Sequence, residues 1–164
     1  MTVLNTYKDV EARRLTFVAE FDAGVDRVWQ VWQDPRQLER WWGPPTYPAT
    51  FDRHEVVVGG QSRYYMTGPE GDKARGWWTI TAVEAPHRLE FDYGFSGDDG
   101  EPLDPADAAH MVVTLDAAGA GTRMTTVTTF ANPQQMETVL AMGMEEGMRL
   151  AMGQIDGVLA PVSR

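Results

Sequence analysis

The ionisable side chains that could perform acid–base or metal chemistry in this chain are few and widely separated. The histidines are His54, His87 and His110, and none stands at the helical spacing of a His-x-x-x-His metal motif. We expect His54 to join a charged surface cluster, His87 to be exposed in a turn, and His110 to lie at the rim of a cavity. The sequence therefore predicts no metal site and no cofactor.

The chain also lacks the residues of a nucleophilic catalyst. It has no cysteine, and the segment 94–97, Gly-Phe-Ser-Gly, lacks the Gly-x-Ser-x-Gly spacing of a nucleophile elbow. An acid–base enzyme stays open as an alternative, and it would use a cavity side chain from the set His110, Tyr64, Tyr93 and Glu90. Because these groups form no convincing constellation, we predict no catalytic residue.

The C-terminal segment carries two rows of residues that suit an adaptable apolar surface. Residues four positions apart lie in one row along a helix. One row is flexible and polarizable and its neighbour is small: Met144, Met148 and Met152 beside Gly143, Gly147 and Ala151. Small residues permit close approach to a sheet, while methionines fit irregular cavities. Core packing is the competing interpretation for each methionine.

Aromatic residues are abundant, with six Trp, five Tyr and six Phe. Buried Tyr and Trp bring polar tips that give an apolar pocket a few directional contacts. We predict a cavity lined by aromatics, methionines and one histidine: Trp29, Trp32, Trp41, Trp42, Tyr64, Met66, Trp78, Phe91, Tyr93, His110, Met144, Met148 and Met152. Core packing stays open for each aromatic, because a one-residue slip in a strand inverts which side chains face inward.

The elements that would position these residues follow from the hydrophobic periodicity. Alternation over 15–21 predicts a strand with one buried side, and helical spacing predicts a short helix over 25–33. Asp34-Pro35 ends that helix and begins a second short one. Strands separated by Gly and Pro turns are expected at 48–58, 61–67, 74–84, 87–95, 109–117 and 122–130. Their short connections favour an antiparallel meander.

The two ends of the chain and one internal loop complete the expected organisation. Asn132-Pro133 is predicted to cap a single helix from about 133 to 160. Residues 1–12 are polar and are expected to form an N-terminal tail before a domain over 13–164. The segment 96–107 is predicted to be an exposed loop that could cover the cavity as a flap. With 164 residues and no internal repeat, one domain is expected.

The charge of the chain excludes several classes of partner. A net charge of −10 opposes binding to nucleic-acid phosphates and to anionic membrane surfaces. No apolar run approaches the ~18 residues that a membrane span needs, and the first residues lack the pattern of a signal peptide. We therefore expect a cytoplasmic protein without nucleic-acid binding or membrane insertion.

Several segments resemble the START-like superfamily, also called SRPBCC, which includes Bet v-like and polyketide cyclase-like domains. They are 28–29, 34–35, 41–44, 58–71, 76–78, 86–91, 121–124 and 144–150. Within the superfamily they resemble the branch named after the C-terminal domain of the activator of the heat-shock-protein-90 ATPase. The resemblance covers about residues 13–160. It implies an α+β helix-grip fold, a curved antiparallel sheet wrapped around a long C-terminal helix with an apolar cavity between them.

The resemblance and the residues together suggest a protein that holds a hydrophobic or aromatic small molecule, lipid or polyketide-like, without transforming it. A cyclase- or hydratase-type enzyme is the first alternative, and a chaperone-regulating interaction domain, as in the namesake of the family, is the second. An exposed strand edge or the Trp41-Trp42 pair could also support a homodimer.

Overall fold

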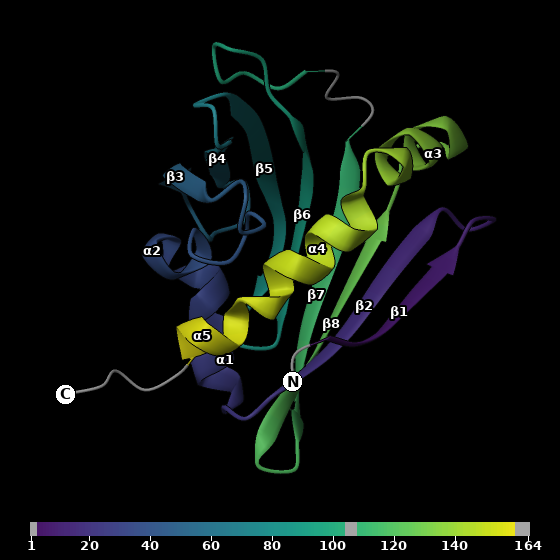
Figure 1. The fold of residues 1–164 in the computed structure, drawn as a ribbon. Coiled ribbons are helices and arrows are strands. Elements are labelled where there is room, and N and C mark those ends of the chain that lie inside the picture. The colour runs from purple at the N-terminus through teal and green to yellow at the C-terminus, as the bar shows by residue number, and fades with distance from the viewer. Residues whose placement is uncertain (1–2, 104–107, 160–164) are drawn as a thin grey trace.

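The strands of this protein form one curved sheet, and the C-terminal helices cross its concave face (Figure 1). The computed structural model describes residues 3–103 and 108–159. In chain order the elements are β1 (Val3–Asp9), β2 (Arg14–Phe21), α1 (Val25–Gln33), α2 (Pro35–Leu38), β3 (Ala49–His54), β4 (Gln61–Thr67), β5 (Lys73–Glu84), β6 (Arg88–Phe95), β7 (Ala109–Ala118), β8 (Gly121–Thr129), α3 (Pro133–Ala141), α4 (Met144–Gly153) and α5 (Ile155–Leu159). The predicted α+β helix-grip fold is confirmed.

Neighbouring strands are antiparallel throughout the described sheet, in the order β1-β2-β8-β7-β6-β5-β4-β3. The alternation predicted for β2 is present, because Leu15, Phe17 and Phe21 are buried while the residues between them are partly exposed. In β6, Phe91 and Tyr93 face the helices, which the sequence pattern alone left undecided. Since side chains alternate along a strand, the residues between them face the opposite side of the sheet.

The two short helices form where the sequence predicts them. Val28, Val31 and Trp32 of α1 are buried, as their helical spacing requires. The Asp34 side chain caps α2 by accepting a hydrogen bond from the backbone N–H of Arg36 at 2.9 Å. Proline stands at the first turn of α2, where its missing N–H is not needed.

The predicted N-terminal tail over residues 1–12 is wrong for the part that forms a strand, residues 3–9. Val3–Asp9 forms β1 and pairs with β2, so that Thr6 lies opposite Phe17 and Lys8 opposite Leu15. An edge strand is held by main-chain hydrogen bonds to its single neighbour, and it needs no alternating apolar pattern to form. The predicted strand 48–58 is also too long, since β3 ends at His54.

The single long helix predicted over about 133–160 is divided into α3, α4 and α5. Asn132 begins α3 as expected, because its side chain accepts a hydrogen bond from the backbone N–H of Gln135 at 2.8 Å. The first break falls at Gly143, whose φ of 87° lies in the left-handed region that glycine adopts at little cost. The second falls at Gln154, between α4 and α5. Periodicity does not register a turn made by one glycine.

Candidate functional site

An open pocket lies between the sheet and the C-terminal helices, where β6 ends and the loop toward β7 begins. Its volume is about 680 Å³, which is within the range of small-molecule sites. The lining residues are Trp42, Pro44, Tyr64, Met66, Tyr93, Gly94, Phe95, Leu103, Ala108, Ala109, Phe130, Asn132, Gln134, Gln135, Thr138, Val139, Met142, Met144, Gly147 and Met148. None of these side chains is charged, so the wall is apolar with a few uncharged polar groups.

Two tyrosines supply polar groups on the sheet side of the pocket. The Tyr93 hydroxyl donates a hydrogen bond to Thr128 Oγ1 at 3.3 Å. Burial raises the pKa of Tyr64 to about 12, an effect that the neighbouring Trp42 indole offsets only in part. Burial also raises the pKa of Tyr93, although its bond to Thr128 opposes the shift. Both hydroxyls therefore stay protonated at neutral pH, where they donate hydrogen bonds but do not serve as bases.

The helix side of the pocket is made by α3, α4 and the break between them. Met144 and Met148 of α4 lie on the wall, with Gly147 between them. Met142, at the break, lines the opening and is 66% exposed. Because thioether side chains are flexible and polarizable, this wall can adjust its shape to different apolar ligands.

Six of the predicted cavity-lining residues are found on the pocket wall, and six others lie in the sealed core beside it. Those on the wall are Trp42, Tyr64, Met66, Tyr93, Met144 and Met148. Those in the core are Trp29, Trp32, Trp41, Trp78, Phe91 and Met152. Whether the wall residues touch a ligand stays a prediction.

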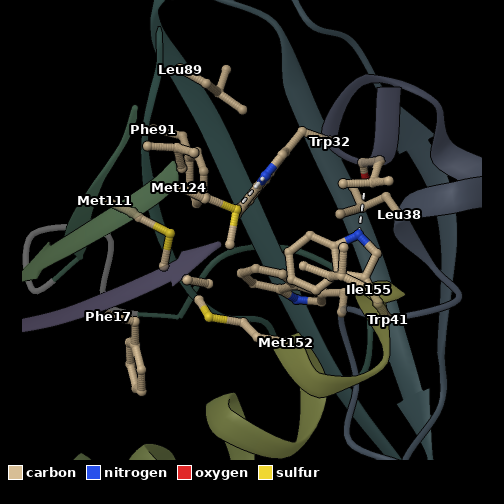
Figure 2. Packing of buried hydrophobic residues seen from close by; sticks show 14 of the residues in the cluster. Phe17, Trp32, Leu38, Trp41, Leu89, Phe91, Met111, Met124, Met152 and Ile155 are labelled. Atoms are coloured by element: carbon tan, nitrogen blue, oxygen red, sulfur yellow. Dashed lines mark hydrogen bonds between the residues drawn. The ribbon is translucent and has the colours of Figure 1, made fainter. Parts of the chain in front are cut away.

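The core cluster fills the other part of the space between sheet and helices (Figure 2). Trp78 stacks on Phe91, with ring centroids 3.9 Å apart and planes 10° from parallel. The Trp32 indole N–H donates to the Met124 sulfur at 3.3 Å, and the Trp41 indole N–H donates to the Val31 carbonyl at 2.8 Å. These aromatics are buried against one another and are absent from the pocket lining, so they are structural rather than part of the pocket wall.

His110 does not lie at the cavity rim, and this prediction is corrected. Its Nδ1 is 2.7 Å from Asp92 Oδ1 and its Nε2 is 3.1 Å from Glu90 Oε1, on the side of β6 and β7 opposite the pocket. Partial burial lowers the pKa of His110, but hydrogen bonds to Asp92 and Glu90 outweigh it and raise the pKa overall. Glu90, whose pKa is lowered by Arg88 and His110, is also outside the pocket.

The prediction that His54 belongs to a surface charge cluster is also wrong. The ring lies edge-on to Phe51 and Trp78, Nδ1 is 2.7 Å from Ser62 Oγ, and Nε2 is 2.7 Å from the Trp32 carbonyl oxygen. A carbonyl accepts only, so Nε2 carries the proton and the Ser62 hydroxyl donates to Nδ1. Burial lowers the pKa of His54, so the ring is neutral.

Several lining residues were missed by sequence reasoning. Some had a usable signal: Phe95 follows Phe91 and Tyr93 in β6, and Gly147 belongs to the small row of the helix. The lining residues of α3 had no such sequence signal, because the direction of α3 relative to α4 depends on the break at Gly143. Leu103 brings the loop after β6 to the wall, while residues 104–107 of the predicted flap lie outside the described residues.

Neither a metal site nor a membrane span was found in the part of the chain that the structure describes. Over residues 3–103 and 108–159, no group of three or more His, Asp or Glu side chains is arranged to hold a metal ion. Among the same residues, no helix has the length and hydropathy required to cross a bilayer.

The curved sheet, the helices across it and the pocket between them define a START-like, helix-grip domain. Residues 22–160 match the family described as "Activator of Hsp90 ATPase homolog 1-like protein". The chain belongs to this family.

Solved structures support the same placement. A protein from Arthrobacter aurescens, solved by NMR, is 57% identical with a TM-score of 0.92, over 96% of this chain and 92% of that one. A crystal structure from Mycobacterium smegmatis is 42% identical with a TM-score of 0.89, over 99% of each chain. A protein of the dynemicin biosynthetic locus is 20% identical with a TM-score of 0.62, over 88% of this chain and 47% of that one, and shares the fold alone. No curated protein matches the chain.

Proposed function

We propose that this domain binds a hydrophobic or aromatic small molecule, lipid or polyketide-like, in the pocket and releases it unchanged. The observation that carries the proposal is an open pocket of about 680 Å³ to whose wall the described residues contribute no charged side chain. Burial of apolar ligand surface is favourable in such a pocket, and the uncharged polar groups would orient the ligand.

A cyclase- or hydratase-type enzyme has weaker support from the site. Of its four candidate groups, His110 and Glu90 lie outside the pocket and are engaged with other charged side chains. Tyr64 and Tyr93 are in the pocket, but burial raises the pKa of each, so neither accepts a proton at neutral pH. A wall with hydrogen-bond donors and without a base favours holding over proton transfer.

Binding can be tested with N-phenyl-1-naphthylamine, an uncharged dye whose fluorescence rises in an apolar environment. A leucine in place of Gly147 would fill the pocket, because this glycine lines it and a Cβ there meets no atom within 4 Å. Gly153 lies in the same helix outside the pocket wall, is exposed, and has the same open space, so Gly153→Leu is the matched control.

We expect saturable dye binding to the unchanged protein and to Gly153→Leu, and an affinity at least about tenfold lower for Gly147→Leu. Circular dichroism would establish that both variants keep the fold. The proposal fails if the unchanged protein gives no saturable signal, or if Gly147→Leu binds the dye as tightly as Gly153→Leu.

A further inference from the structure

Tyr64 is held in the pocket wall by tight packing on three sides. Its ring stacks on Phe51, with centroids 4.9 Å apart and planes 27° from parallel, and meets Trp42 edge-on at 6.1 Å. The third contact is with β5, where Gly76 lies opposite Tyr64 and a Cβ on that glycine would overlap the tyrosine hydroxyl. Glycine at position 76 therefore allows the hydroxyl to occupy a fixed position against the sheet.

The Trp42 indole is a donor toward the Tyr64 oxygen, and the Tyr64 O–H itself donates to no acceptor among residues 3–103 and 108–159. Tyr93 makes the contrast, since its hydroxyl donates to Thr128 Oγ1. The Tyr64 oxygen is not among the sealed atoms without a partner, and the residue lines the pocket, so its O–H is open to a group placed there. An acceptor supplied by a ligand would satisfy this group.

The Trp42 indole lies beside this hydroxyl. The Trp42 indole N–H has no hydrogen-bond partner in the described residues, although Trp42 is only 4% exposed. Trp42 lines the pocket and its ring meets that of Tyr64. The indole N–H groups of Trp77 and Trp78 also lack acceptors, but neither residue is on the pocket wall. The Trp42 N–H is sealed from the pocket space and acts on the Tyr64 oxygen, whose pKa it lowers, so the Tyr64 hydroxyl is the donor that a ligand can reach.

The lack of charge on the described pocket wall limits which ligand groups can accept a hydrogen bond from the Tyr64 hydroxyl. Among residues 3–103 and 108–159, no lysine, arginine or histidine lines the pocket, so an ionised carboxylate or phosphate placed there would lose its hydration without gaining a counter-charge from them. A carbonyl oxygen has two lone pairs and carries no net charge, and it loses far less on leaving water.

Building on the proposed function, we infer that the pocket selects uncharged, mainly apolar molecules with a carbonyl oxygen that accepts a hydrogen bond from the Tyr64 hydroxyl. The ketone would reach the inner wall while the apolar body lies against the methionines of α4. The Tyr64 donor decides which apolar molecules are preferred, and the methionine wall accommodates their shape.

The test compares 9-fluorenone with fluorene, two molecules that differ by a carbonyl in place of a methylene. Each displaces N-phenyl-1-naphthylamine from the unchanged protein, from Tyr64→Phe and from Tyr65→Phe. Tyr65 is the matched control because it is the next residue of β4 and lies outside the pocket wall. It pairs with Arg75 of β5, and the cationic groups of Lys73 and Arg75 lie over its ring. The 2-carboxylate of 9-fluorenone adds a charged arm.

We expect 9-fluorenone to bind about 5-fold more tightly than fluorene, the net effect of one neutral hydrogen bond. Tyr64→Phe removes this preference, Tyr65→Phe keeps it, and the carboxylate binds more weakly than the ketone. Equal affinities in the unchanged protein, a preference that survives Tyr64→Phe, or tighter binding of the carboxylate overturns the inference. If the dye still binds in those cases, the proposed function stands; if the dye does not bind, both fail.

Discussion

The space between the sheet and the C-terminal helices has two parts that use the same residue types differently. In the sealed part, Trp78 and Phe91 stack face to face and Met152 is fully buried. In the open part, Phe95 is 53% exposed and Met148 lines a pocket. Met148 and Met152 lie one helical turn apart, and Phe91 and Phe95 lie in one strand. Residue type therefore does not assign a side chain to core or to pocket, but its position along the element does.

The two phenylalanines of β6, Phe91 and Phe95, give the largest expected difference in unfolding free energy between the two parts. Phe91→Ala should lower the free energy of unfolding by about 3–5 kcal/mol, because it leaves a cavity among packed aromatics. Phe95→Ala should change it by less than about 0.5 kcal/mol, since half of that side chain is already in solvent. Urea denaturation of both variants measures the difference. Similar losses in the two variants would contradict the division into a sealed and an open part.

The helix pair makes the same comparison on the other wall. Met152→Ala should cost about 2–5 kcal/mol of unfolding free energy, because Met152 is buried against the aromatic cluster. Met148→Ala should cost less than about 1 kcal/mol of unfolding free energy and should change dye affinity, because Met148 lines the pocket. Met152→Ala should leave the dye affinity of the folded protein unchanged. Denaturation and dye titration on the same samples separate the two effects. A larger stability loss for Met148→Ala would reverse the assignment.

His54 tests whether the sealed part excludes water and charge. Burial lowers its pKa in the folded state, so the unfolded chain takes up the proton first as the pH falls. The stabilisation is complete above the unfolded value of about 6.5 and is lost as the pH falls from there to the folded pKa, with a slope of at most about 1.4 kcal/mol per pH unit.

Substituting His54 separates its contribution to the pH dependence of stability from that of His110. The raised pKa of His110 has the opposite sign, since its stabilisation is present at low pH and is lost as the pH rises through the folded value. We expect His54→Gln to lose less stability than the unchanged protein between about pH 7.5 and 5.5. NMR titration of the His54 ring gives the folded pKa directly, and a value at or above the unfolded one would refute a buried neutral ring.

The smallest expected effects come from two glycines of α4 and have opposite signs, at its N-cap Gly143 and at Gly147 inside the helix. Gly143→Ala should destabilise the protein by about 1 kcal/mol, because its φ of 87° is strained for any residue with a Cβ. Gly147→Ala should stabilise it by about 0.5–1 kcal/mol, because this glycine is inside a helix and its Cβ position is free. Thermal unfolding of both variants checks the signs. Stabilisation by Gly143→Ala would mean that the helix is continuous.

The fold was predictable from sequence to a larger extent than the site. Alternation places β2 within one residue, and Asn132 marks the start of α3, because both signals are local. The pocket depends on long-range geometry. Trp32 and Trp41 join the core because α1 and α2 pack against the sheet, and the α3 wall depends on one left-handed glycine. His110 was misplaced because the face of a strand cannot be fixed until its register is known.

The pairing of β2 with β8 has a consequence for how a newly made chain behaves. Arg14 pairs with Thr129 and Phe21 with Thr122, so about a hundred residues separate each partner from the other. At a synthesis rate of about 5–20 residues per second, β2 waits roughly 5–20 s before its partner has been translated. During that interval β1 and β2 form at most an isolated hairpin, which is marginally stable in water. The apolar face of Leu15, Phe17 and Phe21 is then the part of the nascent chain most in need of protection on the ribosome.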